Sequence, residues 1–341
     1  MEMKEPMTSV NTMPERSLKN KRVLITGIAG FGGSWLAETI LQNEKNAEVF
    51  GLKRRTTSTK NIIHIMDKLQ IFDADITDPV ALNKAIKEIK PNAAFHLAAV
   101  VSSTRAREYP DTTMKTNVDG TKNLLDALTK GDQDLEIFHF ASTSTIYKNK
   151  TTKKSMPIKE EHPLEAHDPY SKSKIEAEKI CNEFFEKEEI PIVITRAFNQ
   201  GGPRCIEDIV ANKIAKIAVT AKNEGKQEFV FGNTDAVRDF TDVRDVVNGY
   251  WLAVKKGRVG EVYNLCSGKG IKIKDLIDIA LNYVGLENKV KIVADKKLFR
   301  KGESNVIIGD NTKAREELGW KPKIPFEQTL KEMIDYYLSL S

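Results

Sequence analysis

The chain has 341 residues, with 40% hydrophobic and 30% charged side chains, so it can bury the core of one large domain or of two fused lobes. Its formal net charge of +5 is small for this length, which argues against a nucleic-acid-binding surface. No apolar run is long enough to cross a membrane, and the three cysteines lack metal-ligand spacing, so we expect a cytoplasmic protein without a metal site.

The N-terminal part of the chain is polar at first and then becomes regular. Residues 1–20 lack the apolar middle of a signal peptide, and we expect them to form a flexible extension. From residue 21 to about 200, short apolar runs alternate with amphipathic stretches. The runs predict strands at 23–26, 49–52, 69–72, 93–97, 137–141 and 192–197. The stretches between them predict helices near 33–45, 79–89, 112–130 and 171–188.

This alternation is typical of parallel strands joined by right-handed crossovers. We therefore predict an α/β fold with a Rossmann-type doubly wound parallel sheet over residues 21–200, which binds ligands beyond the carboxyl ends of its strands.

After residue 200 the pattern is less regular. Helices are expected at 207–222, 243–255, 274–284, 311–318 and 326–339, and short extended pieces at 228–231, 262–265 and 291–293. We predict that residues 201–341 form a smaller, mixed α/β lobe that binds substrate, and that the chain crosses between the lobes more than once.

Three glycines follow the first predicted strand in the segment Gly27-Ile-Ala-Gly30-Phe31-Gly-Gly33. This spacing permits a tight turn, close approach of the backbone to a pyrophosphate, and close packing of a helix against a strand. The pyrophosphate would then lie at a helix N-terminus, which favours anions. The alternative is an ordinary glycine-rich turn, but the position directly after an apolar strand favours a dinucleotide-binding loop that includes Phe31.

The end of the second strand indicates which dinucleotide is bound. An acidic residue there would bind the ribose hydroxyls of NAD, but this strand ends in Lys53-Arg54-Arg55. A basic cluster can pair with the 2′-phosphate of NADP, although it can also be a solvated turn. The sequence therefore favours NADP, with NAD still possible.

The third and fourth strands are each followed by residues that we expect beside the cofactor. Asp75 and Ile76 follow the third strand, and the Asp75 carboxylate can accept from the adenine amino group or cap a helix. His96 ends the fourth strand and is expected to pack near the cofactor without acting as a catalyst. The residues after it complete this group: Leu97, Ala98 and Ala99.

The segment after Pro169 carries the candidate chemistry. Tyr170 and Lys174 are four residues apart, so on a helix they share one face. A nearby ammonium stabilises a phenolate and is expected to lower the pKa of Tyr170, which can then exchange a proton with a sugar hydroxyl. The alternative is a surface helix pair. A third member, a hydroxyl group, is expected within 142–145.

With the glycine loop, the hydroxyl cluster and the Tyr170/Lys174 pair, the chain resembles the extended short-chain dehydrogenase/reductases that act on nucleotide sugars, over about residues 21–338. In that family the catalytic hydroxyl lies four residues before an aromatic residue. The resemblance therefore implies that Thr143, four residues before Tyr147, is catalytic. It further implies that Ser144 and Thr145 lie at the substrate.

The same resemblance implies how the protein assembles. Asn117, which we assign to the cofactor-binding residues, matches a helix that supports the active site in the family. That helix and the one that carries Tyr170 form a four-helix contact between subunits in the family. We therefore expect a homodimer or a dimer-based tetramer.

Several segments resemble the GDP-sugar branch of the family, which includes GDP-mannose 4,6-dehydratase and GDP-4-keto-6-deoxymannose reductase. They lie at 51–56, 198–214, 232–245 and 298–320. By this resemblance a GDP-sugar is the favoured substrate. Its diphosphate and nucleoside are expected to contact Asn199, Arg204, Lys213, Arg238 and Arg300. Such convergent donors suit a dianionic diphosphate, because arginine provides planar forks.

One departure from the family pattern bears on the reaction. The 4,6-dehydratases have a Glu two residues before the aromatic, and this Glu removes a proton from sugar C5. Here that position is Thr145, whose hydroxyl cannot act as a base at carbon. A Thr at this position is similar to UDP-galactose 4-epimerase and its relatives.

We therefore expect redox chemistry at sugar C4 without elimination, by an epimerase or by a 4-keto reductase. The basic turn favours the reductase, and the sequence Ser144-Thr145-Ile146-Tyr147 favours the epimerase. Two alternatives stay open: a GDP-mannose-type 4,6-dehydratase with a non-standard base, and a catalytically silent relative that binds a dinucleotide. The intact pair of Tyr170 and Lys174 speaks against the silent relative.

Overall fold

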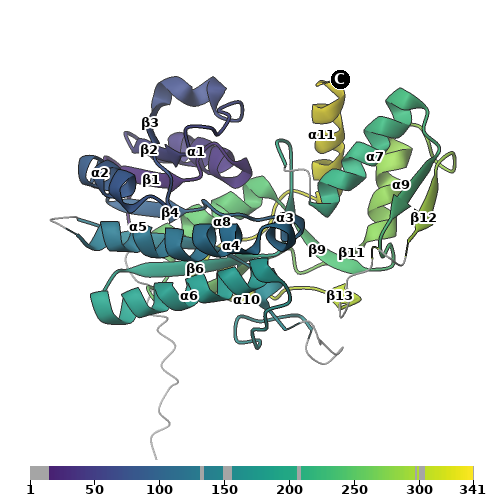
Figure 1. The fold of residues 1–341 in the computed structure, drawn as a ribbon. Coiled ribbons are helices and arrows are strands. Elements are labelled where there is room, and N and C mark those ends of the chain that lie inside the picture. Colours follow the sequence, from purple (N-terminus) through teal and green to yellow (C-terminus); the bar gives the residue numbers. More distant parts are fainter. Residues whose placement is uncertain are drawn as a thin grey trace, which may run out of the picture.

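A seven-stranded parallel sheet forms the centre of the computed structural model, which describes residues 15–130, 134–148, 156–205, 209–295, 298 and 304–340 (Figure 1). The strand order is β10-β6-β5-β4-β1-β2-β3, so it reverses between β1 and β4. Ligands bind such sheets in the crevice at this reversal, beyond the carboxyl ends of the strands. The strands are β1 (Arg22–Thr26), β2 (Glu48–Lys53), β3 (Leu69–Asp73), β4 (Ala93–His96), β5 (Ile137–Thr143), β6 (Ile192–Ala197) and β10 (Val262–Leu265).

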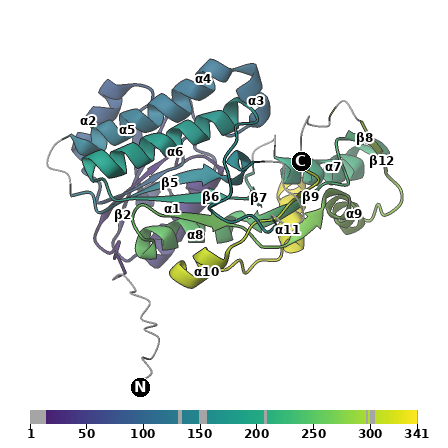
Figure 2. The ribbon, with the colours of Figure 1, turned by 90° about the horizontal axis from the view of Figure 1, so that it is seen from below.

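Helices cover both faces of this sheet, and its strands are almost continuously apolar as a result (Figure 2). One face carries α2 (Pro79–Ile89), α4 (Pro110–Met114), α5 (Gly120–Thr129) and α6 (Pro169–Glu188), with the short α3 (Ser103–Glu108) after β4. The other face carries α1 (Phe31–Asn43), α8 (Val243–Lys256) and α10 (Thr312–Leu318). Within the described ranges, none of the helices has the length and apolar character needed to span a bilayer.

A smaller lobe of mixed structure lies beside the large sheet (Figure 1). Its central strand β9 pairs with three short strands, antiparallel to one and parallel to the others. A separate parallel pair, β8 with β12, completes it. The strands are β7 (Asn199–Gly201), β8 (Glu228–Phe231), β9 (Val237–Asp242), β11 (Gly270–Lys272), β12 (Lys291–Ala294) and β13 (Val306–Ile307), and the helices are α7 (Val210–Glu224), α9 (Ile273–Tyr283) and α11 (Phe326–Leu338). This architecture confirms the predicted α/β fold class.

The chain passes between the two lobes more than once. After α7 and β9 it returns to the large lobe, where α8 packs on the sheet and β10 pairs with β6 as the outermost strand. We had placed the extended piece at 262–265 in the smaller lobe. The boundary at residue 200 therefore does not separate two continuous segments.

The start of the described chain is better ordered than the expected extension over residues 1–20. Leu18 is 2% exposed and belongs to the main apolar core. The Arg16 guanidinium donates to the carbonyl oxygens of Val254 and Gly257, at 3.2 and 2.9 Å, at the end of α8. These contacts satisfy carbonyl groups that a helix end leaves without partners. Residues 1–14 lie outside the described ranges.

Most predicted elements match the structure within a few residues. The expected helix at 112–130 consists of α4, a π turn over Lys115–Asp119 and α5. The expected helix at 207–222 begins at Val210, and residues 206–208 lie outside the described ranges. The sequence patterns did not predict α3, β7, β9, β11 or β13.

Candidate active site

The glycine turn has the geometry of a dinucleotide cradle. Gly27 has φ 71°, and a Cβ there would lie 3.0 Å from the backbone of Ala98. A Cβ on Gly33 would lie 2.2 Å from the carbonyl oxygen of Gly27, so no side chain fits at either position. Helix α1 begins directly after Gly30, so no side chain caps its N-terminus. The first turn of α1 has no acidic residue. The N-terminal N–H groups of α1 are therefore available to an anion.

Thr26, which His96 contacts, holds the segment after β4 next to the end of β1. Thr26 Oγ1 accepts from the backbone N–H groups of Leu97 and Ala98 at 3.2 and 3.1 Å, and lies 2.7 Å from His96 Nδ1. The other ring nitrogen, Nε2, lies 3.0 Å from Thr121 Oγ1. Burial lowers the pKa of His96 to about 3, so the ring is neutral. This matches a packing role for His96, with Ala99 continuing the same segment.

The three basic residues at the end of β2 differ in their contacts. Lys53 Nζ forms an ion pair with Asp73 Oδ1 at 2.6 Å. Arg54 and Arg55 are exposed and, among the described residues, their guanidinium groups have no hydrogen-bond or ion-pair partner. Lys53 therefore already has a carboxylate partner, whereas the two arginines have none among the described residues.

The Asp75 side chain stabilises the turn in which it lies. Its Oδ1 accepts from the backbone N–H and the hydroxyl of Thr77, at 2.9 and 2.8 Å. Asp78 is the N-cap of α2, so the capping role that we considered for Asp75 belongs to Asp78. Ile76 is buried, and its carbonyl oxygen accepts from Asn123 Nδ2 at 3.0 Å.

Local sequence explains why Tyr170 stands at the start of a helix. Asp168 accepts from the N–H of Ser171 in a capping box, and Pro169 fits the first helical position. Tyr170 is 8% exposed and its phenol is hydrogen-bonded to Thr143. Burial raises the pKa of Tyr170 to about 12.

The expected lowering of the Tyr170 pKa by Lys174 is therefore not seen. The Lys174 ammonium donates to the carbonyl oxygen of Ala141 at 2.6 Å and lies 4.1 Å from the centre of the Phe140 ring. Burial also lowers the pKa of Lys174 to about 8. The two side chains do share one face of α6, but desolvation governs the titration of each.

Thr143 ends β5 and opens a 3₁₀ turn over Ser144–Ile146. Its Oγ1 accepts from the backbone N–H of Thr145 at 3.2 Å and lies at the same distance from Thr145 Oγ1. Ser144 is half-buried and Thr145 is exposed. The carboxylate position of the dehydratases thus carries an exposed hydroxyl that lies next to Thr143.

Asn117 connects the strand ends to α6. It lies in the π turn, where its Oδ1 accepts from the N–H of Val100 at 2.7 Å. Its Nδ2 donates to the carbonyl oxygen of Val100 at 3.0 Å and to Ser173 Oγ at 2.9 Å. Because Ser173 lies one residue before Lys174, Asn117 fixes this turn of α6, which agrees with a supporting role.

A buried ionic network behind the site was missed by sequence reasoning. Glu178, one helical turn after Lys174, accepts two hydrogen bonds from Arg196 on β6, at 3.0 and 2.6 Å. Arg196 Nη1 also donates to the hydroxyl of Tyr147 at 3.1 Å, and that hydroxyl donates to Asn264 Oδ1 at 2.7 Å. The network therefore joins α6, β6 and β10 to the turn after Thr143. The only sequence signal was the spacing of Glu178 from Lys174.

Glu178→Gln is expected to lower the free energy of unfolding by about 3 kcal/mol, because it leaves the Arg196 charge buried without its partner. The measurement is chemical denaturation followed by circular dichroism. The control is Glu176→Gln on the same helix, which breaks an exposed pair with Lys179 and should change stability by only about 0.5 kcal/mol. If both variants lost the same free energy of unfolding, the larger contribution assigned to the buried Glu178–Arg196 pair would be contradicted.

The residues predicted to contact the nucleotide differ in burial and in the contacts that they make. Asn199 on β7 donates to the carbonyl oxygen of Asp239 at 3.1 Å, and Arg238 is buried and donates to the carbonyl oxygen of Val237 at 2.9 Å. Lys213 is exposed on α7. Arg300 lies outside the described residues. The substrate contacts of this group stay predictions.

Arg204 lies against the cofactor lobe. Its Nη1 donates to Glu38 Oε1 at 2.6 Å and to the carbonyl oxygen of Asn61 at 3.2 Å, and its guanidinium lies 4.0 Å from the centre of the Trp35 ring. In this conformation Arg204 fastens the segment after β7 to α1. Its charge is already paired there, which argues against the diphosphate contact that we expected.

The chain is similar to known proteins over most of its length. The family model described as GDP-mannose 4,6 dehydratase matches residues 24–333. GDP-mannose 4,6 dehydratase 1 of Arabidopsis thaliana is 31% identical, over 94% of this chain and 91% of its own length. GDP-6-deoxy-D-mannose reductase of Pseudomonas aeruginosa is 28% identical, over 92% of this chain and 96% of its own.

Solved structures agree with the sequence relatives. UDP-glucose 4-epimerase of Thermotoga maritima superposes with a TM-score of 0.82 at 26% identity, over 93% of this chain and 99% of its own. The RMD protein of Pseudomonas aeruginosa, solved with NADPH, has a TM-score of 0.80 at 27% identity and covers 94% of this chain and 100% of its own. From the matched family model and the shared architecture, the chain belongs to the GDP-mannose 4,6-dehydratase family, within the NAD(P)-dependent extended short-chain dehydrogenase/reductases.

Proposed function

We propose that the protein is an NADPH-dependent reductase that acts at C4 of a nucleotide-diphosphate 4-keto sugar, with a GDP-sugar as the favoured substrate. The observation that carries this proposal is the buried Tyr170 phenol, hydrogen-bonded to Thr143, beside a hydroxyl at Thr145 in place of a carboxylate. A hydroxyl does not remove a proton from carbon, so the arrangement favours redox chemistry at C4 over elimination of water.

The residues at the glycine turn fit a dinucleotide. Side chains are excluded from Gly27 and Gly33, and the N-terminus of α1 offers free N–H groups beside them. The guanidinium groups of Arg54 and Arg55, which have no partner among the described residues, follow β2, where the adenosine ribose of a dinucleotide lies in this fold. Two planar forks suit a 2′-phosphate, which supports NADPH over NADH.

A reduced nicotinamide, when bound, would supply the hydride, and a side chain of the protein supplies the proton. Because the pKa of Tyr170 is raised to about 12, the phenol keeps its proton at neutral pH and donates it to the C4 oxygen. The Thr143 hydroxyl, bonded to the same phenol, orients that oxygen. Lys174, with a pKa of about 8, is still largely charged at pH 7, and its ammonium donates to the carbonyl oxygen of Ala141.

A panel of nucleotide sugars tests the proposal. Purified protein with NADPH is incubated with GDP-, UDP-, dTDP- and CDP-linked 4-keto sugars, both 6-deoxy and 6-carboxylate, and with the parent hexoses. The expected result by mass spectrometry is a gain of two hydrogen atoms on a 4-keto sugar. Loss of water from a hexose would identify a dehydratase, and absence of any conversion would favour a silent dinucleotide-binding relative.

Epimerisation at C4 is the second candidate. The Thr145 position and the likeness to a UDP-glucose 4-epimerase support it. An epimerase returns the hydride to the same sugar, so the product mass equals that of the substrate and NADPH is not consumed. A hexose whose configuration changes without a change in mass would replace the reductase proposal.

A further inference from the structure

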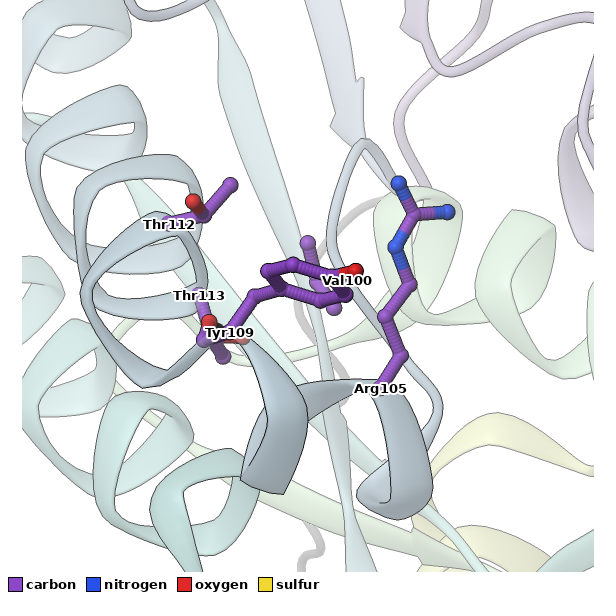
Figure 3. A pocket seen from close by; sticks show the side chains of 5 residues that line it. All are labelled: Val100, Arg105, Tyr109, Thr112 and Thr113. Atoms are coloured by element: carbon purple, nitrogen blue, oxygen red, sulfur yellow. Dashed lines mark hydrogen bonds between the residues drawn. The ribbon is translucent and has the colours of Figure 1, made fainter.

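A small pocket lies between α3 and α4, in the segment that follows β4 (Figure 3). It has a volume of about 150 Å³ and is lined by Val100, Arg105, Tyr109, Thr112 and Thr113. Figure 3 shows the Tyr109 ring beside Val100, with the Arg105 side chain rising from α3 on the other side. A cation, an aromatic ring and two hydroxyl-bearing residues surround one space, which suits a small polar group.

The charge in this pocket has no partner of its own. Arg105 is exposed and, in the part of the chain that the structure describes, its guanidinium makes no hydrogen bond or ion pair. Arg107 on the same helix differs, because it pairs with Asp168 at 3.4 Å. A guanidinium without a partner presents a planar set of donors that matches a carboxylate.

The pocket is tied directly to the helix that carries Tyr170. Val100, in its wall, is bonded through both backbone groups to Asn117, which also donates to Ser173. The Arg107–Asp168 pair joins α3 to the residue that caps α6. Figures 1 and 2 both place α3 on the side of the large lobe that faces the smaller lobe. These contacts connect the pocket to the first turn of α6, where Tyr170 lies.

We propose that this pocket binds a carboxylate on the sugar of the nucleotide-sugar substrate, and that Arg105 determines this specificity. The proposal rests on the proposed function, because a sugar with C4 at Tyr170 directs its other substituents toward the crevice walls. A space of 150 Å³ is about five times the ~30 Å³ share of one liquid water, enough for a carboxylate and its carbon but not for a nucleotide. The diphosphate is expected elsewhere, at the smaller lobe.

Binding measurements test the proposal without requiring turnover. Calorimetric titrations in the presence of NADP⁺ compare UDP-glucuronate with UDP-glucose, and GDP-mannuronate with GDP-mannose. We expect the wild-type protein to bind the uronate of at least one pair about tenfold or more tightly than the neutral hexose. Arg105→Met should remove this difference while leaving hexose binding unchanged, and Arg105→Lys should restore part of it.

The matched control is Arg315→Met, which removes an exposed arginine from α10 and should preserve the preference for uronate. Equal wild-type affinities for uronate and hexose would overturn the pocket proposal. An equal loss of both sugars in Arg105→Met would also overturn it, since that result assigns Arg105 to the diphosphate or nucleoside. Absence of binding by every nucleotide sugar would instead overturn the proposed function, and the pocket proposal with it.

Discussion

Replacing Tyr170 by Phe is expected to lower kcat by roughly 10²–10⁴-fold, because the variant has no proton to give to the substrate oxygen. The ring still fills its buried position on α6, so the fold and the binding of NADPH should persist. The measurement is consumption of NADPH with the substrate identified by the panel, together with a fluorescence titration of NADPH. A loss in kcat with unchanged cofactor affinity separates chemistry from binding.

Tyr263→Phe provides the matched control. Tyr263 lies on β10, and its hydroxyl donates to Glu317 at 2.7 Å, on the side of the sheet that carries α10. Removing that hydroxyl takes away this hydrogen bond and the one that it accepts from the backbone N–H of Arg258 at 3.0 Å, and should leave kcat unchanged. If Tyr170→Phe retained wild-type turnover, the phenol would not be the proton donor and the mechanism would have to be replaced.

The double substitution of Arg54 and Arg55 by Ser is expected to weaken NADPH binding by about 100-fold or more, with NADH binding unchanged. Each guanidinium is exposed and has no partner in the described part of the chain, so each can form charge-assisted hydrogen bonds, worth about 1.5–3 kcal/mol, with a 2′-phosphate. Direct titration of both cofactors against the wild type and the variant measures the effect. The ratio of the two dissociation constants is the informative quantity.

Lys60→Ser is the control for charge, because Lys60 is an exposed cation in the same loop. Loss of one positive charge at this position should leave both cofactor affinities close to those of the wild type. If the double variant bound NADPH and NADH more weakly by the same factor, the arginines would support the loop and would not contact the 2′-phosphate.

The sequence predicted those parts of the fold that depend on patterns among neighbouring residues. The strands of the large sheet are short apolar runs between turn residues, and their buried positions follow from helices on both faces. The cofactor turn was visible because close backbone contacts at Gly27 and Gly33 exclude any other residue. The shared face of Tyr170 and Lys174 followed from helical spacing alone.

The parts that were missed depend on contacts between distant residues. The strand at 262–265 has no local feature that identifies β6 as its partner. Arg204 was itself predicted to contact the substrate, yet its guanidinium contacts Glu38, Asn61 and Trp35. The direction of the Tyr170 pKa shift was wrong because it depends on burial by the surrounding structure, which a four-residue spacing does not reveal.

The position of β10 has a consequence for how the protein is made. The large sheet is complete only when residue 265 has left the ribosome, after α7, β8 and β9 have already emerged. Until then the β6 edge presents unpaired backbone groups, which are prone to pair with other chains. Neither lobe can be cut away without removing a strand from its neighbour. A nucleotide bound in one lobe therefore protects the other from unfolding as well, because only the joint native state binds it.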